Sequence, residues 1–283
     1  MTSPTVWLAC AAFVIMETAP SPAAPSIQVT GLTGQIPPAA LLPAVFGDRK
    51  EDVDLQLNGA TTPSASLRAD FFQVSGSLSL PLSRDVHLQE KLTLPSATSP
   101  QNLRVPIQFP AVARRTELLL RLTLVQDAPL SPIPLGEIRF DLFPTGITKE
   151  LTDLLQPTPN GHEPVLLFGS GTKLRHFLTG LHVHFEDLGG DTPDRFDPKR
   201  LYFGELDTEE KFHQAQDRSA GGRVIVFSPD DSLPVGAYTN PSGSGLFIQV
   251  TAPLLDNLDT DPRAQLALIK FIHLLSNPPP SAN

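Results

Sequence analysis

Cysteine is almost absent from this sequence. The single cysteine, Cys10, lies in an apolar segment that we expect to be removed from the mature protein. A mature chain without cysteine has no disulfide bond, no thiolate metal ligand and no cysteine nucleophile. The cysteine content therefore excludes three classes of chemistry together.

The chain also lacks an excess of positive charge. Its 283 residues carry a formal net charge of -9, and no basic cluster offsets this balance. Nucleic acids and anionic membranes are bound by basic surfaces, so we expect neither as a partner. The 30 prolines suit turns and edge strands better than helical bundles. A chain of this length is expected to form about two domains.

No hydrophobic run is long enough to cross a bilayer as a helix. The apolar run over residues 6–16 has the length of a signal-peptide core, and small residues after it predict cleavage near Ala23, although no Lys or Arg precedes it. We predict an export signal over residues 1–24, a secreted or periplasmic protein, and no transmembrane segment in the mature chain. The alternatives are a buried first strand and lipidation at Cys10; the apolar run continues past Cys10, which disfavours lipidation.

Apolar and polar residues alternate through residues 25–145. Val53, Leu55 and Leu57, for example, are separated by Asp54 and Gln56. This period of two is typical of strands with one buried and one wet face. We expect strands over residues 27–30, 53–57, 67–80, 88–94, 103–109, 118–124 and 138–142. Together they predict an antiparallel β-sandwich domain of the immunoglobulin-like type.

Two local features of these strands carry further predictions. The alternation slips at Phe71 and Phe72, which indicates a β-bulge. Pro106 lies within an expected strand, and proline cannot donate a ladder hydrogen bond, so that strand is expected to be an edge strand or to carry a bulge.

The pattern changes after residue 145. Ile147, Leu151, Leu154 and Leu155 share one helical face, and we interpret residues 146–163 as a helical linker. From residue 164 to 277, apolar strands at 165–168, 181–185, 200–206, 223–227 and 245–250 alternate with helices near 172–179, 208–219 and 262–275. This predicts a three-layer, flavodoxin-like α/β domain with a mainly parallel sheet. Residues 278–283 are expected to form a disordered tail.

Helix ends in this half are marked by specific residues. Asp207 and Glu210 form a D-x-x-E pair that suits the start of the second helix. Asp261 followed by Pro262 suits the start of the third. Gly180 is the expected stop of the first helix.

The turn after the first parallel strand is the first candidate site. Gly169, Ser170, Gly171 and Thr172 lie between a strand and a helix, where backbone N–H groups can hold an anion. However, the dinucleotide pattern G-x-G-x-x-G requires a third glycine where Leu174 stands, and the phosphate-loop pattern is absent. We therefore interpret the glycines first as turn residues, with anion or nucleotide binding as an alternative.

A second candidate is the H-x-H pair. His182 and His184, with Glu186, share one face of the expected strand over residues 181–185. Such a pair with a carboxylate can bind zinc, but a half-wet edge strand gives the same alternation. Our prediction is no metal and no cofactor.

Nucleophilic catalysis has no clear signature in the sequence. The G-x-S-x-G elbow is missing, and no Ser/His/Asp trio is singled out. If a hydrolytic site exists at the strand ends of the α/β domain, the first suspects are Ser170, His182, His184 and Asp230.

Longer stretches of both halves resemble known modules. The C-terminal half, in "VLLFGSGTKLRHFL", "RVIVFSPDD" and "GSGLFIQVTAPLLDNLDTDPRAQLALIKFIHLLS", resembles a degenerate class I glutamine-amidotransferase-like domain, of the kind found at the end of some bacterial glycoside hydrolases. The N-terminal half, in "LRADFFQVSGSLSLPL" and "LLLRLTL", is similar to the immunoglobulin-like modules of the same enzymes.

The resemblance implies more about what the chain lacks than about what it does. Active amidotransferases carry a cysteine nucleophile in a G-x-C-x-G elbow, whereas this chain reads "FSPDD" at residues 227–231. The glycoside hydrolase barrel, which needs about 250 residues, does not fit in the α/β half.

Taken together, these patterns favour an exported, non-catalytic accessory or interaction protein, with carbohydrate or a protein such as a partner enzyme as candidate partners. The alternatives are a hydrolase with an unrecognised site at the carboxyl ends of the α/β strands, and anion or nucleotide binding at the Gly169 to Thr172 turn.

Overall fold

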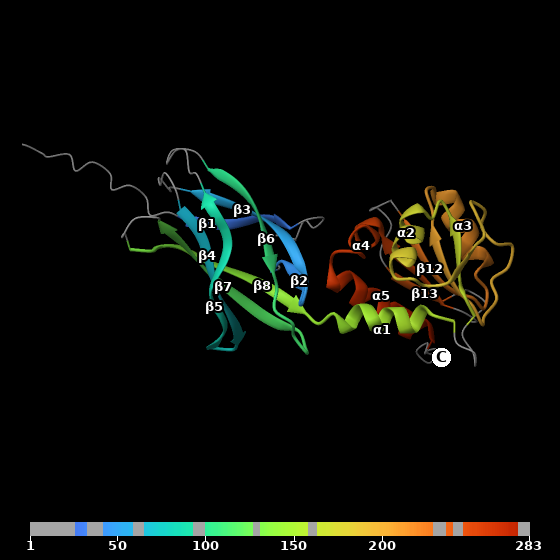
Figure 1. Ribbon diagram of the computed structural model, residues 1–283. Helices are drawn as coiled ribbons and strands as arrows, with labels where there is room; N and C mark the ends of the chain where they lie inside the picture. The colour runs from blue at the N-terminus through green and yellow to red at the C-terminus, as the bar shows by residue number, and fades with distance from the viewer. Residues whose placement is uncertain are drawn as a thin grey trace, which may run out of the picture.

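The computed structural model describes residues 26–32, 42–58, 65–92, 100–126, 131–157, 163–228, 236–239 and 246–276. A strand-rich part comes first in the chain, and a part in which helices flank a sheet follows it (Figure 1). The expected signal segment over residues 1–24, the tail over residues 278–283 and Asp230 lie outside the described residues.

The strand-rich part contains two sheets. One has the order β1-β3-β6 and is antiparallel throughout; the other has the order β2-β8-β7-β4-β5 and is antiparallel except where β2 pairs with β8. The strands are β1 (Ser26–Leu32), β2 (Ala44–Phe46), β3 (Lys50–Asn58), β4 (Ala65–Ser75), β5 (Leu78–Leu92), β6 (Gln101–Gln108), β7 (Thr116–Gln126) and β8 (Ile133–Phe143). The inward residues of both sheets form one hydrophobic cluster, which includes Val53, Leu55 and Leu57 as their alternation predicts.

The expected strand over residues 67–80 is wrong, because the chain reverses within it. Gly76 has a φ of 59°, and Ser75 pairs with Leu78 across a two-residue turn, so β4 and β5 form a hairpin. The expected strand over residues 88–94 is the end of β5. The pairing of β4 with β5 does shift between Phe71 and Phe72, as the predicted bulge requires, but the extra residue lies on β5.

Both sheets have edges with distinct chemistry. Pro106 lies in β6, the edge of the three-stranded sheet, which confirms the edge prediction.

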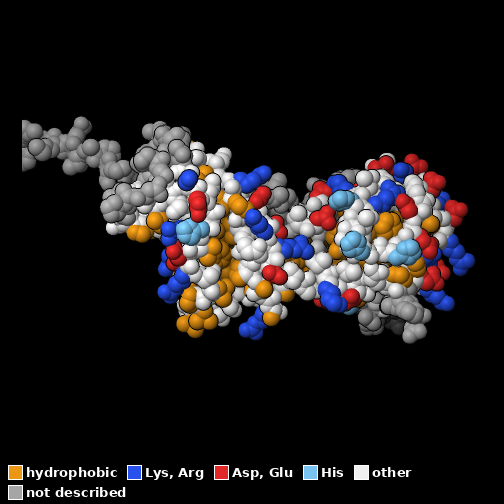
Figure 2. Space-filling model, in the orientation of Figure 1, with side chains coloured by type: hydrophobic (Ala, Val, Ile, Leu, Met, Phe, Trp, Pro, Cys, Tyr) orange, Lys and Arg blue, Asp and Glu red, His pale blue; other side chains and the backbone are white. Residues whose placement is uncertain are grey.

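On β5, the edge of the five-stranded sheet, Leu78, Leu80 and Leu82 are 66%, 56% and 42% exposed. Apolar side chains are visible at the surface of the strand-rich part, and acidic and basic ones are intermingled on the other part (Figure 2).

The second part is built on a six-stranded sheet of order β10-β9-β11-β12-β14-β13. The first five strands are parallel and β13 pairs antiparallel with β14. Its strands are β9 (Val165–Gly169), β10 (Phe185–Asp187), β11 (Leu201–Glu205), β12 (Arg223–Ser228), β13 (Gly236–Thr239) and β14 (Leu246–Thr251). The parallel sheet was predicted, but β13 was not, and the second strand begins at Phe185 instead of residue 181.

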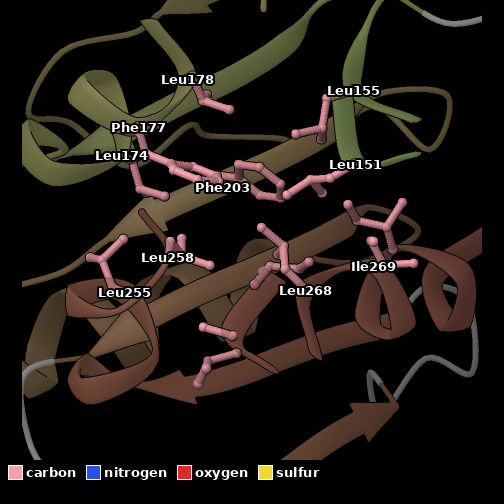
Figure 3. Packing of buried hydrophobic residues seen from close by; sticks show 14 of the residues in the cluster. Leu151, Leu155, Leu174, Phe177, Leu178, Phe203, Leu255, Leu258, Leu268 and Ile269 are labelled. Atoms are coloured by element: carbon pink, nitrogen blue, oxygen red, sulfur yellow. The ribbon is translucent and has the colours of Figure 1, made fainter. Parts of the chain in front are cut away.

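Helices cover both faces of this sheet. They are α1 (Gly146–Leu155), α2 (Thr172–Gly180), α3 (Glu209–Arg218), α4 (Ala252–Asp256) and α5 (Pro262–Ser276). Residues from α1, α2, α4 and α5 share one hydrophobic cluster with one sheet face, while α3 contributes Phe212 and Ala215 to a cluster on the other. Figure 3 shows the first cluster, with Leu151 of α1, Phe177 of α2 and Leu268 of α5 converging around Phe203. Burial on both faces explains why these strands are continuously apolar.

The N-terminus of α3 is capped by a different residue from the one expected. Thr208, and not Asp207, is the N-cap of α3, since its side chain accepts a hydrogen bond from the Lys211 N–H at 3.3 Å. Asp207 instead pairs with the Lys211 ammonium. At α5, Asp261 accepts from the Arg263 N–H at 2.8 Å, as expected for a cap. No helix in the described ranges is long and apolar enough to span a membrane.

The two parts are joined by a charged contact and by apolar packing. Asp141 of β8 is almost buried and accepts hydrogen bonds from Arg115 and from Arg263 of α5. Burial by itself raises the pKa of Asp141, but the two guanidinium groups outweigh it and hold the pKa below its ordinary value. Phe46 and Phe143 of the strand-rich part belong to the same hydrophobic cluster as α1 and α5.

Candidate functional site

The candidate turn lies at the carboxyl end of β9 and leads into α2. Gly169 and Gly171 have φ angles of 83° and 51°, which favour glycine. A Cβ at Gly169 would lie 2.3 Å from the backbone oxygen of Glu205 on the neighbouring strand. The backbone of β11 therefore approaches this turn as closely as only glycine permits.

Ser170 is held by the same carbonyl. Its backbone N–H and its hydroxyl both donate to Glu205 O, at 2.9 and 3.0 Å. Thr172 donates its hydroxyl to Ser170 O at 3.3 Å. In the part of the chain that the structure describes, neither a histidine nor a carboxylate accepts the Ser170 hydroxyl proton, so the geometry does not show an activated serine.

The N-terminus of α2 is occupied by the Glu205 side chain. A carboxylate oxygen of Glu205 accepts a hydrogen bond from the Lys173 N–H at 3.2 Å. The first N–H groups of a helix have no intrahelical acceptor and attract anions. Glu205 thus fills part of the position that a phosphate or a substrate carboxylate takes in other strand–turn–helix sites.

Two ion pairs flank this turn. Lys173 pairs with Asp256 of α4, and Arg175 pairs with Asp187 of β10. The hydrogen bond from Arg175 holds the pKa of Asp187 below its usual value, and the hydrogen bond to Asp256 raises the pKa of Lys173. Arg175 also donates to Ser170 O at 2.9 Å. Both basic side chains at the turn, Lys173 and Arg175, therefore have an acidic partner within the protein.

The two candidate histidines lie at the opposite end of the parallel strands, where the strands begin. Phe185, which follows them, pairs with Val165 at the start of β9, whereas Ser170 follows the end of β9. Five residues of strand separate the two positions, roughly 16 Å at the usual rise. The structure does not bring His182 and His184 together with Ser170, and Asp230 lies outside the described residues.

His182 and His184 also precede the strand instead of lying on it. His182 has a φ of 55° and follows the last residues of α2; its N–H donates to Thr179 O at 3.0 Å, and the Val183 N–H donates to Leu178 O at 3.0 Å. These bonds form a Schellman motif with His182 in the left-handed position. The predicted helix stop at Gly180 matches the end of α2, but Gly180 is the last helical residue and has no positive φ, so His182 takes the left-handed position.

The H-x-H zinc interpretation depended on a shared strand face with Glu186. Glu186 instead forms an ion pair with Arg200 at 2.9 Å. Within the described ranges, no group of three or more His, Cys, Asp or Glu residues is placed to hold a metal ion.

Glu205 is the residue that sequence reasoning missed. A signal was available, because Glu205 ends the third parallel strand and the expected 2-1-3 order places that strand beside β9. The pairing of Glu205 with Gly169 then puts the carboxylate next to the turn.

Comparisons with known proteins give little further information. No protein family and no curated protein matches the chain. Among solved structures, a family 123 glycoside hydrolase from Clostridium perfringens, described in connection with glycolipid glycan hydrolysis, is similar with 12% identity and a TM-score of 0.24. The match covers 87% of this chain and 46% of that one, so this chain spans less than half the length of that protein.

Proposed function

We propose that this protein is an exported, non-catalytic accessory or interaction protein. In this proposal an immunoglobulin-like sandwich precedes a flavodoxin-like α/β domain that serves as a scaffold. The order of the parallel strands along the sheet, 2-1-3-4-5 when they are counted in chain order, supports the flavodoxin-like assignment.

The observation that carries the non-catalytic proposal is the position of Glu205. In doubly wound sheets, ligands bind at the carboxyl ends of the strands. Here the β9 turn at that edge is bonded to the backbone and the side chain of Glu205. A substrate anion would have to displace a carboxylate that is part of the fold.

The proposed partners are carbohydrate or another protein. The carbohydrate part rests on the resemblance of both halves to modules of bacterial glycoside hydrolases. The interaction part is supported by the exposed leucines of β5, since exposed apolar surface is common where proteins associate.

Activity measurements on the purified full chain test this proposal. We expect no turnover of chromogenic glycosides, sugar esters or amides above the buffer rate. The matched variants are Ser170→Ala at the turn and Ser79→Ala on β5, which is exposed and remote from it. Turnover that Ser170→Ala abolishes and Ser79→Ala retains would overturn the proposal in favour of the alternative, a hydrolase at the strand ends.

Binding measurements test the positive part. Affinity electrophoresis through gels that contain soluble polysaccharides is expected to retard the protein if carbohydrate is the partner. Unchanged mobility in a broad polysaccharide panel would remove carbohydrate and leave a protein partner.

A further inference from the structure

A cavity opens at the amino edge of the parallel sheet, the end opposite to the turn. Its volume is about 220 Å³. The first residues of the central strands and the last residues of two helices line it: Leu154, Leu155, Glu163, Val165, Lys199, Leu201, Arg223, Ile272, His273, Leu275 and Ser276. Six of these side chains are aliphatic and form an apolar wall, and the others add charged and polar groups.

One carboxylate and two basic side chains line this cavity. Glu163 is paired with Arg200 at 2.9 Å, and Arg200 also pairs with Glu186. Across the described ranges, Lys199 and Arg223 have no acidic partner. The Arg223 guanidinium donates to the Lys199 carbonyl, and its Nε atom is buried without a described hydrogen-bond partner. An arginine with five N–H donors and one protein acceptor retains capacity for a carboxylate.

Helix ends and the surplus carboxylate of the Glu163, Arg200 and Glu186 group oppose the positive charge of Lys199 and Arg223. The C-termini of α1 and α5 lie at the cavity, because Leu155 and Ser276 line it. Each helix C-terminus carries about half a negative elementary charge. The group of Glu163, Arg200 and Glu186 contains one more acidic than basic side chain, so with the two helix ends it offsets the charges of Lys199 and Arg223. What favours an anion here is the set of unused N–H donors on Arg223.

The size of the cavity limits the ligand. At about 30 Å³ per water molecule, the volume corresponds to roughly seven water-sized groups. Ligand pockets for drug-sized molecules start at about 300 Å³, so this cavity can enclose only a small molecule or a small group. An aliphatic chain of a few carbons fits the apolar wall.

We propose that this cavity binds a small amphiphilic monocarboxylate. The carboxylate lies against Arg223 and Lys199, and the short aliphatic tail lies against Leu155, Leu201 and Ile272. This site lies at the other end of the sheet from the Glu205 turn and does not depend on the function proposed above.

Three probes of similar shape separate the contributions of head and tail. Hexanoate, 1-hexanol and hexylammonium are titrated into the full chain, and binding is measured by calorimetry or by ligand-observed NMR. We expect saturable hexanoate binding, and at least about tenfold weaker binding of the other two, because only the carboxylate forms charge-assisted hydrogen bonds to arginine. Acetate, which keeps the head without the tail, is expected to bind more weakly than hexanoate.

Variants then locate the site. Arg223→Gln is expected to weaken hexanoate binding about tenfold, and Lys199→Glu about fivefold, through loss of charge-assisted contacts. Lys199 is exposed, so its replacement preserves folding if Arg223→Gln does not. Lys50→Glu, an exposed residue of β3, makes the same change of net charge far from the cavity and is expected to leave binding unchanged.

The outcomes are distinct. The absence of saturable hexanoate binding, equal or stronger binding of hexanol or hexylammonium, or full affinity in Lys199→Glu would each overturn the proposal. Absence of glycoside turnover leaves it unaffected, because the turnover measurement addresses the opposite edge of the sheet.

Discussion

The two ends of the parallel strands, the carboxyl edge where they finish and the amino edge where they begin, differ in how many of their polar groups have partners within the protein. At the carboxyl edge, Glu205 is bonded to the β9 turn, and Lys173 and Arg175 are paired with acidic residues. At the amino edge, an apolar cavity opens beside Lys199 and Arg223, which have no acidic partner among the described residues. The edge at which α/β sheets place their ligands is thus the better satisfied of the two.

The strand-rich part lies on the carboxyl side of the parallel sheet. The C-termini of α1 and α5 lie at the amino edge, so both helices begin toward the carboxyl edge, on the side of the strand-rich part (Figure 1). There Arg263 of α5 reaches Asp141, and Phe46 and Phe143 pack with the helices. Contacts between the two parts therefore use the carboxyl side, and the amino edge faces away from them.

The largest effect is expected for Gly169→Ala. The new Cβ would meet the Glu205 carbonyl at 2.3 Å, and the φ of 83° is unfavourable for alanine. The Glu205 carbonyl belongs to the central strand β11 and cannot move without breaking the hydrogen bonds of the sheet. We therefore expect a loss of about 3–5 kcal/mol in the free energy of unfolding. Urea denaturation measures it.

Gly221→Ala is the matched control at the amino edge. Gly221 has a similar φ of 80°, but a Cβ there would meet nothing within 4 Å. Only the conformational cost remains, about 1–2 kcal/mol. Equal losses in the two variants would contradict the close approach at the carboxyl edge.

The second largest effect is expected for Asp141→Ala. It removes the nearly buried acceptor that Arg115 and Arg263 share, and we expect a loss of about 2–3 kcal/mol. Glu186→Ala removes a half-exposed partner of Arg200 at the amino edge and is expected to cost at most about 1 kcal/mol. Thermal and urea unfolding measure the loss of stability in both variants. A larger loss in Glu186→Ala than in Asp141→Ala would contradict the view that the carboxyl side holds the stronger ion pairs.

Asp141 also predicts a dependence of stability on pH. Its folded-state pKa lies below the ordinary value, so the unfolded chain takes up this proton at higher pH than the folded one. The stabilisation is complete above the unfolded pKa, about 3.9, and is lost as pH falls through the lower folded pKa. We expect wild type and Asp141→Ala to converge in stability at low pH. A constant difference down to the acid transition would argue against this linkage.

A smaller effect, with a gain of function, is expected for Glu205→Ala. Loss of the carboxylate at the N-terminus of α2 is expected to cost about 1 kcal/mol. The Lys173 N–H can then donate a hydrogen bond to inorganic phosphate, and thermal shift is expected to reveal phosphate binding in the variant but not in wild type.

Glu205→Gln separates charge from shape at this position. It keeps an oxygen acceptor for the Lys173 N–H and is expected to bind phosphate less well than Glu205→Ala. Phosphate binding of equal strength in wild type would show that Glu205 does not occupy the anion position.

The fold was predictable wherever burial leaves a periodic trace in the sequence. Val53, Leu55 and Leu57 alternate because one face of β3 is wet, and residues 165–168 are continuously apolar because both faces of β9 are buried. The hairpin at Gly76 was missed since alternation continues through it into Leu78 and Leu80, which are exposed on β5 and fill no core.

The candidate site was less predictable because it depends on contacts between distant segments. The turn glycines were correctly interpreted as conformational, yet the partner that demands Gly169 lies 36 residues later, at Glu205. The cavity at the amino edge is formed by the ends of α1, α5 and three strands, and no single stretch of sequence contains its pattern. Periodicity reports burial within an element but not which side chains meet across elements.

The smallest effect concerns the end of α2 at the amino edge. His182 occupies a left-handed position that favours glycine, whereas Gly180 lies in the helix with open space around its missing Cβ. We expect Gly180→Ala to stabilise the protein by about 0.5–1 kcal/mol and His182→Gly by up to about 1 kcal/mol. Urea denaturation of both single variants and of the double variant measures these gains. If Gly180→Ala is destabilising instead, Gly180 is the stop that the sequence suggests. If both substitutions are stabilising, the fold tolerates a non-glycine residue with positive φ at His182. The turn at Gly169 does not tolerate one, because the Glu205 carbonyl leaves no room for a Cβ.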